Sequence, residues 1–168
     1  MIEKKEPEAP KKHTPKRVSI HCTDTPNNCE VSIKAITADH VQRGFGGIGY
    51  HVVIQPNGHT EWVKPLNRVG AHVAKANTGN IGIALAGKDK FAYAQFRSLR
   101  LALDAIRQSY PDIRPWMIYC HSEYASAKAQ GKTCPNMDQQ QLLGWYCGHN
   151  DDAIEDYLIE NDRRYTLV

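Results

Sequence analysis

The sequence lacks any run of about 18 apolar residues, the length that a membrane-spanning helix needs, so we expect no membrane insertion. A dominant charge of one sign is also missing, since 21 Lys and Arg oppose 18 Asp and Glu for a formal net charge of +3. This weak excess tolerates an anionic partner without requiring one, and we expect no nucleic-acid partner. The opening MIEKKEPEAPKKHTPKR has no apolar stretch, so we expect no secretory signal.

Cysteines are few, and their spacing and odd number argue against a closed structural zinc site and against a disulfide framework. The chain has five, an odd number, and no Cys-x-x-Cys pair. A closed structural zinc site usually draws four ligands from such close pairs. An odd count without an export signal also favours reduced thiols over a disulfide framework.

The length of 168 residues and the hydrophobic fraction of 41% suit one globular domain. We expect a disordered charged tail over residues 1–15, the domain over 16–148, and an acidic C-terminal segment over 149–168 that can form a helix at 151–162. A basic docking arm is the alternative for the tail. No apolar surface stripe indicates an obligate dimer, so we expect a monomer.

The hydrophobic periodicity predicts an α/β fold, a single domain with a mixed central β-sheet of about five strands flanked by helices. Apolar residues at Val31, Ala35, Ala38 and Val41 predict the buried face of the first helix. The glycine run at 44–49 follows a helix and opens a strand, the reverse of a dinucleotide-binding loop. The expected strands are 17–23, 49–55, 61–64, 80–87 and 114–123, and the expected helices are 30–44, 93–110 and 137–148.

Two strands carry a histidine next to a cysteine: His21 precedes Cys22, and His121 follows Cys120. Because side chains alternate along a strand, each cysteine points away from its histidine and can be a small buried hydrophobe. If the strands are neighbours, the histidines converge, and Cys134 can reach them from the following loop. Three N and S ligands from distant positions suit zinc with an open fourth position. The alternative is two ordinary hydrogen-bonded strand histidines, which would converge by chance fairly often among eight.

Four segments together resemble the type-2 N-acetylmuramoyl-L-alanine amidases: VSIHCTDT, IGYHVVIQPNG, GAHVAKANTGNIGIALAG and HSE…GKTCPNMD. T-odd phage lysozymes, wall-recycling amidases and peptidoglycan recognition proteins share this zinc fold. The segments follow the order of the family and cover roughly residues 16–147. The resemblance implies zinc ligands at His21, His121 and Cys134, and a catalytic pair of Tyr50 and Lys132. The implied substrate is peptidoglycan, cleaved between N-acetylmuramic acid and L-alanine.

Each implied role has a physical reason and a simpler alternative. Lys132 can place its ammonium where the oxyanion develops, and the Tyr50 phenol can bond the attacking water or the intermediate. Otherwise they are a solvated loop lysine and a strand aromatic. The resemblance places His72 near the substrate cleft and, more weakly, Asn80 as a second substrate-binding residue; a plain loop histidine and a capping or turn asparagine are the alternatives. Glu123 is expected to orient a ligand rather than act as the base.

Two departures point to the phage-lysozyme branch. Wall-recycling members carry a glutamate in the strand that here holds Ala84 and Ala86, and the third ligand is a cysteine rather than an aspartate. The segment from His121 to Cys134 is longer than in compact members, which affects the reach of Lys132. The expected function is a zinc-dependent endolysin, held in the host cytoplasm until another protein permeabilises the membrane. The alternatives are a non-catalytic peptidoglycan-binding module, and a lysin that also regulates a polymerase.

Overall fold

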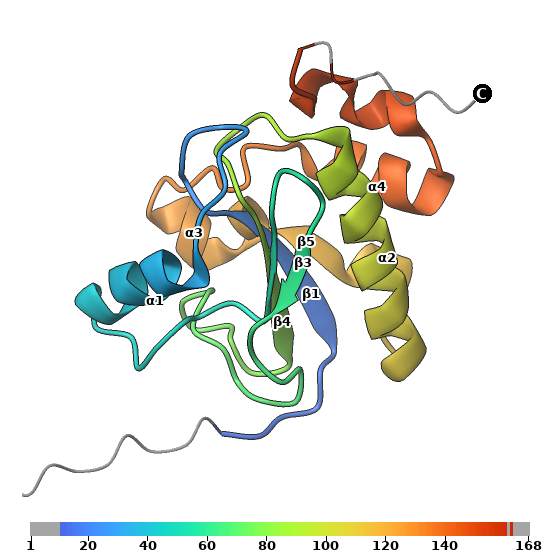
Figure 1. The fold of residues 1–168 in the computed structure, drawn as a ribbon. Helices are drawn as coiled ribbons and strands as arrows, with labels where there is room; N and C mark the ends of the chain where they lie inside the picture. Colours follow the sequence, from blue (N-terminus) through green and yellow to red (C-terminus); the bar gives the residue numbers. More distant parts are fainter. Residues whose placement is uncertain (1–10, 161, 163–168) are drawn as a thin grey trace, which may run out of the picture.

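The computed structural model describes residues 11–160 and 162, and it contains a five-stranded mixed sheet (Figure 1). The strand order is β3-β2-β4-β1-β5, with β1, β2, β4 and β5 parallel and β3 antiparallel to β2. The predicted α/β fold is therefore confirmed. The strands are β1 (Arg17–Cys22), β2 (Val52–Ile54), β3 (Thr60–Trp62), β4 (Asn80–Leu85) and β5 (Ile118–Cys120).

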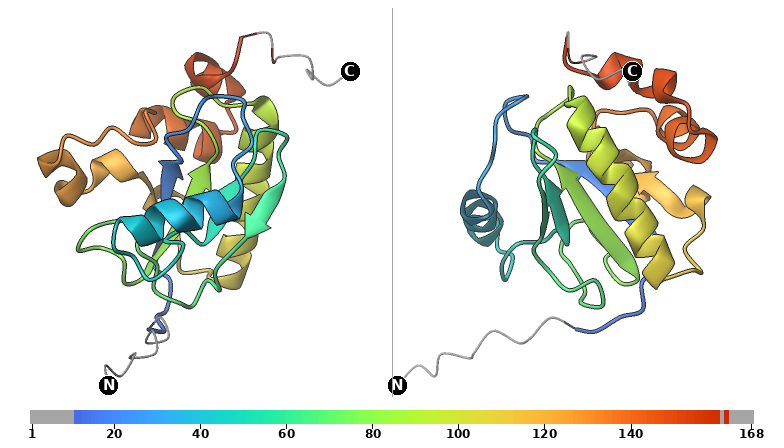
Figure 2. Two further views of the ribbon diagram at one scale, coloured as in Figure 1. Left: turned by 60° about the vertical axis from the view of Figure 1, so that its left-hand side comes forward. Right: turned by 45° about the vertical axis from the view of Figure 1, so that its right-hand side comes forward.

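Helices cover both faces of this sheet (Figure 2). Helix α1 lies on one side, and α2 and α4 lie on the other. Among the described residues, no helix is long and apolar enough to cross a lipid bilayer. The α-helices are α1 (Ile33–Gln42), α2 (Tyr93–Ser109), α3 (Ala125–Ala129) and α4 (Gln139–Gly148), and the 3-10 helices are η1 (Pro115–Met117), η2 (His121–Glu123) and η3 (Asp151–Tyr157).

The two faces of β1 differ in chemistry, as the alternation predicted. Val18, Ile20 and Cys22 belong to the apolar core that α2 and α4 complete. Ser19 and His21 point to the other face and are equally buried. The sheet thus has one apolar face, which packs against α2 and α4, and one face that bears buried polar side chains. The buried α2 and α4 side chains of the core are Phe96, Leu99, Ala102, Leu103, Ile106, Leu142, Trp145 and Tyr146.

Gln95 ties α2 to the carboxyl ends of two strands. Its Nε2 donates to the carbonyls of Ile54 (3.0 Å) and Ala86 (2.9 Å), and its Oε1 accepts from the Ala92 amide (2.9 Å). The side chain is fully buried, so no water can replace these bonds. Gln95 therefore fixes the edge of the sheet at which β2 and β4 end.

Several predicted boundaries need correction. The strand expected at 114–123 is only Ile118–Cys120, because the turn that begins at Pro115 and the turn of η2 bracket it. His121 therefore lies just beyond the strand. The buried face of α1 was also wrong: Ile36 and His40 point inward, whereas Val41 is 54% exposed. This helix covers the polar face of the sheet, so its inward residues include a histidine.

The structure describes part of each end of the chain. Residues 11–15 were assigned to the tail, yet the Lys11 carbonyl accepts from the Val69 amide (2.7 Å) and the His13 amide donates to Asn67 (2.9 Å). The rest of that tail, residues 1–10, lies outside the described residues. In the C-terminal segment the helix is a 3-10 helix, η3, whose Ile154 is fully buried in the core.

The position of Gln95 generates a stability prediction. Gln95→Leu leaves the Ala86 carbonyl and the Ala92 amide without the Gln95 bond and takes from the Ile54 carbonyl one of its two bonds, so the free energy of unfolding should fall by about 2 kcal/mol. The matched control is Gln140→Leu, because Gln140 lies exposed near the start of α4. Urea denaturation of both variants measures the difference. Equal stability of the two variants would show that the Gln95 bonds contribute nothing net.

Candidate active site

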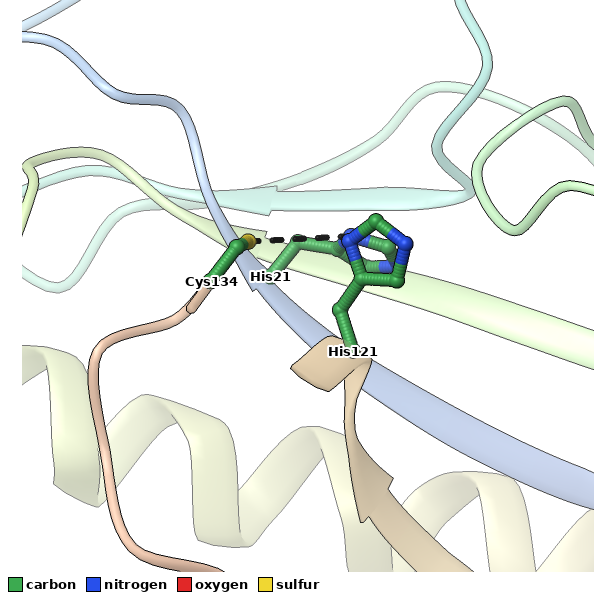
Figure 3. Close-up of side chains that lie close together, drawn as sticks. All are labelled: His21, His121 and Cys134. Carbon is green, nitrogen blue, oxygen red and sulfur yellow. Dashed lines mark hydrogen bonds between the residues drawn. The ribbon is translucent and has the colours of Figure 1, made fainter. Parts of the chain in front are cut away.

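The carboxyl ends of the parallel strands bring His21 and His121 together. In the β1–β5 register, Ile20 pairs with Cys120, so the next residues along each chain are the two histidines. Their rings lie with centroids 4.5 Å apart. Cys134 approaches from the loop before α4, and Figure 3 shows the three side chains turned toward a common point. The sequence prediction that these three residues converge is therefore met.

The geometry of the three side chains suits a metal ion. One ligand atom from each of His21, His121 and Cys134 can be chosen so that all lie within 4.8 Å of one another. The Nδ1 of His21 lies 3.9 Å from the Sγ of Cys134. Both histidines are buried, and Cys134 is partly buried. The set leaves one side open toward a cleft, as a site that admits substrate must.

Burial keeps the two histidines neutral, which a metal ligand requires. Desolvation lowers the pKa of His21 well below its usual value, and the neighbouring His72, His121 and Lys132 lower it further. Desolvation, with the charge of Lys132, lowers the pKa of His121 to about 4. At neutral pH each ring therefore keeps a nitrogen lone pair.

Cys22 lies closer to this cluster than the alternation suggested. Its side chain is buried in the core, as predicted. Its backbone amide nevertheless donates to the Cys134 Sγ (3.2 Å), and the two sulfurs are 3.7 Å apart. The Cys22 thiol and burial both raise the pKa of Cys134. Sequence reasoning missed this contact because it depends on where a distant loop crosses the end of β1.

Tyr50 and Lys132 line the same cleft as the three candidate ligands, a space of about 520 Å³. The Tyr50 ring packs against His21 (centroids 5.1 Å apart) and His40 (5.0 Å). Desolvation raises the pKa of Tyr50 far above its usual value, so its phenol remains a proton donor. Lys132 is exposed in the loop after α3, where its amide donates to the Ala127 carbonyl (3.0 Å).

His40 is a residue that sequence reasoning did not connect with the site. Its Nδ1 accepts from the Gly49 amide (2.8 Å), and this bond anchors the chain just before Tyr50. A Cβ at Gly49 would lie 2.0 Å from the Ala71 carbonyl oxygen, so only glycine fits there. The sequence offered a weak signal: His40 lies four positions after Ile36 and therefore on the same face of the helix.

The remaining predicted site residues lie at different depths. His72 lines the cleft, and its Nδ1 is 3.0 Å from the Nε2 of His21. Asn80 is fully buried behind the His72 ring. Its Oδ1 accepts from Ser19 (2.8 Å), and its Nδ2 donates to the Ala76 carbonyl (2.9 Å). The exposed Glu123 pairs with Lys128 at 3.2 Å. A direct role for each of them in substrate binding or ligand orientation stays a prediction.

The chain is similar to known proteins in sequence. Residues 11–137 match the N-acetylmuramoyl-L-alanine amidase family. The endolysin of Enterobacteria phage K11 is 28% identical over 132 residues, covering 74% of this chain and 82% of the phage protein. The endolysin of Escherichia phage T7 is 29% identical over 137 residues, covering 77% and 83%.

The fold also matches solved structures. The N-acetylmuramoyl-L-alanine amidase LysC from Clostridium intestinale URNW superposes with a TM-score of 0.63 at 26% identity, covering 73% of this chain and 77% of that one. The family match spans the three candidate ligands and the cleft they face. This chain belongs to the N-acetylmuramoyl-L-alanine amidase family.

Proposed function

We propose that the protein is a zinc-dependent endolysin that hydrolyses the amide between N-acetylmuramic acid and L-alanine in peptidoglycan. The observation that carries this proposal is the convergence of His21, His121 and Cys134 beside an open cleft, in a chain of the amidase family. The phage endolysins to which the chain is similar support the lytic role. In this role the enzyme would stay in the host cytoplasm until the membrane is permeabilised.

The donor set fits zinc better than harder cations. Two imidazoles and one thiolate are ligands that zinc accepts, whereas Mg²⁺ and Ca²⁺ prefer carboxylate and carbonyl oxygens. His21, His121 and Cys134 would hold the ion. When bound, zinc supplies Lewis-acid chemistry, polarising the scissile carbonyl and lowering the pKa of water.

Two residues of the cleft would act on the charge that develops on the substrate. Lys132 offers a positive charge at the mouth of the cleft, where it can stabilise an oxyanion. Tyr50 keeps its proton, so its phenol can donate a hydrogen bond to the same oxygen or hold the attacking water. Both contributions grow as the transition state forms, so they should raise kcat more than substrate affinity.

The metal set leads to the first functional prediction. The purified protein should contain about one zinc per chain, the stoichiometry of a single mononuclear site. Cys134→Ala should lose the metal, abolish hydrolysis of purified sacculi and lower the melting temperature, because metal binding contributes folding free energy. Elemental analysis, turbidity loss and calorimetry measure the three effects. Cys147→Ala is the matched control, since Cys147 is exposed in α4. Full zinc occupancy in Cys134→Ala would contradict the ligand assignment.

A second prediction separates catalysis from binding. Lys132→Ala and Tyr50→Phe should keep zinc and still bind sacculi, while their rates of hydrolysis fall about a hundredfold or more. Lys34→Ala and Tyr110→Phe are the controls: Lys34 lies exposed in α1, and Tyr110 caps the C-terminal end of α2, outside the cleft. Initial rates and pull-downs on the same sacculi give both readouts. Wild-type protein that binds sacculi without releasing the amine of L-alanine would be a binding module instead.

The ligand pKa values predict the pH dependence of metal binding. The lowered pKa values of His21 and His121 leave both rings neutral at pH 7, so they release no proton. The raised pKa of Cys134 leaves a thiol that must lose its proton. Zinc binding should therefore release about one proton per chain, and affinity should rise about tenfold per pH unit between roughly pH 6 and 8. Titration calorimetry in buffers of different ionisation enthalpy counts the protons. Measured near pH 6, where water on a zinc ion with a pKa of about 7 keeps its proton, release of none, or of two, would refute the assignment.

A further inference from the structure

Buried histidines form a continuous row beneath the cleft. The rings of His51 and His72 have centroids 5.7 Å apart, and those of His72 and His21 lie 5.0 Å apart. Each of these rings bonds to a backbone group or to the next ring. Because each hydrogen bond needs one donor and one acceptor, these bonds determine which nitrogen of each ring carries the proton.

The first bond in the row is unambiguous. The Nε2 of His72 lies 3.1 Å from the backbone carbonyl of Asn80. A carbonyl oxygen only accepts, so Nε2 of His72 must carry a proton. The His72 ring is buried between two other imidazoles, those of His21 and His51, where an imidazolium charge would be costly, so the ring is neutral and its Nδ1 has a free lone pair.

The second hydrogen bond joins His72 to the candidate ligand His21. The Nδ1 of His72 lies 3.0 Å from the Nε2 of His21, and both atoms are buried. Since Nδ1 of His72 can only accept, Nε2 of His21 must donate. In the neutral His21 ring the lone pair is then on Nδ1, the atom that faces Cys134.

The surrounding backbone is shaped to hold the His72 ring in this position. A Cβ at Gly82 would lie 2.7 Å from Cγ of His72, and one at Gly70 would lie 2.8 Å from its Cδ2. The Oδ1 of Asn77 accepts from the backbone amides of His72 (2.9 Å) and Val73 (2.8 Å). Two glycines therefore make room for the ring, and one asparagine fixes the main chain that carries it.

We propose that His72 is a positioning residue. By donating from Nε2 to the Asn80 carbonyl and accepting at Nδ1 from His21, it fixes His21 as the Nε2–H tautomer and aims the Nδ1 lone pair of His21 at the metal. This inference rests on the proposed metal site. It assigns His72 an action through His21 in place of a contact with substrate. Second-layer bonds of this kind set both ring orientation and ligand basicity at metal sites.

Nitrogen-15 NMR of the metal-free protein tests the tautomer directly. Long-range ¹H–¹⁵N correlations should show His21 and His72 each protonated at Nε2. His72→Asn places an amide oxygen close to the former Nδ1 and should preserve the His21 tautomer. His72→Phe removes the acceptor, so His21 should become a mixture of tautomers. A proton on Nδ1 of His21 in the wild type would overturn the inference, whether or not zinc binds.

Zinc affinity, measured by competition with a chelator, gives the second readout. His72→Phe should bind zinc about 10–100-fold more weakly, whereas His72→Asn should remain within about threefold of the wild type. His51→Phe is the matched control, because His51 is fully buried and bonded to the Arg68 carbonyl (2.7 Å) and the Gly82 amide (3.0 Å) but is one ring removed from His21.

The outcomes are distinguishable. If folded His72→Asn and His72→Phe lose zinc affinity equally, His72 has only a structural role. The same holds if His51→Phe loses as much zinc affinity as His72→Phe. If His72→Phe does not fold, the wild-type tautomer and the His72→Asn affinity still decide the question. A wild-type protein that binds no zinc would refute the proposed function, while the tautomer measurement would still stand by itself.

Discussion

The register of β1 between its two parallel neighbours is the constraint on which the site depends. β1 pairs with β4 over six residues and with β5 over three, and this pairing places His21 next to the start of η2. A slip of one residue would turn His21 into the apolar core and Cys22 toward the cleft. The core packing of Val18 and Ile20 against α2 and α4 therefore fixes the position of the candidate ligand. Parallel pairing also collects the strand ends at one edge, where ligands bind in open α/β sheets.

Burial has two consequences at this edge. It keeps the histidines neutral and therefore able to bind a cation. It also obliges every ring nitrogen to find a partner, because an unpaired buried polar atom is costly. Backbone groups of the loops that precede β2 and β4 provide these partners for His40 and His51, and the Asn80 carbonyl at the start of β4 provides one for His72. The polar face of the sheet thus organises the site through the same bonds that make its burial tolerable.

The sequence predicted those features that depend on local pattern. The alternation along β1 correctly placed His21 and Cys22 on opposite faces, and the periodicity of α2 correctly gave a helix packed on the core. The motifs around His121 and Cys134 placed both in the cluster because family resemblance carries non-local information. The inward face of α1 was wrong, since the helix covers histidines rather than an apolar layer. The contacts of Cys22 with Cys134, and of His72 with His21, join residues 112 and 51 positions apart, and no local pattern encodes them.

The most direct test of the central claim is the X-ray absorption fine structure of the zinc-loaded protein at the zinc edge. An open site built from His21, His121 and Cys134 predicts one sulfur at about 2.3 Å and two imidazole nitrogens at about 2.0–2.1 Å, with a further light atom in the open position. The nearby Cys22 makes the contrary result concrete. Two sulfurs and two nitrogens would mean that Cys22 joins Cys134 in a closed shell, and the proposed catalytic centre would then be a structural one.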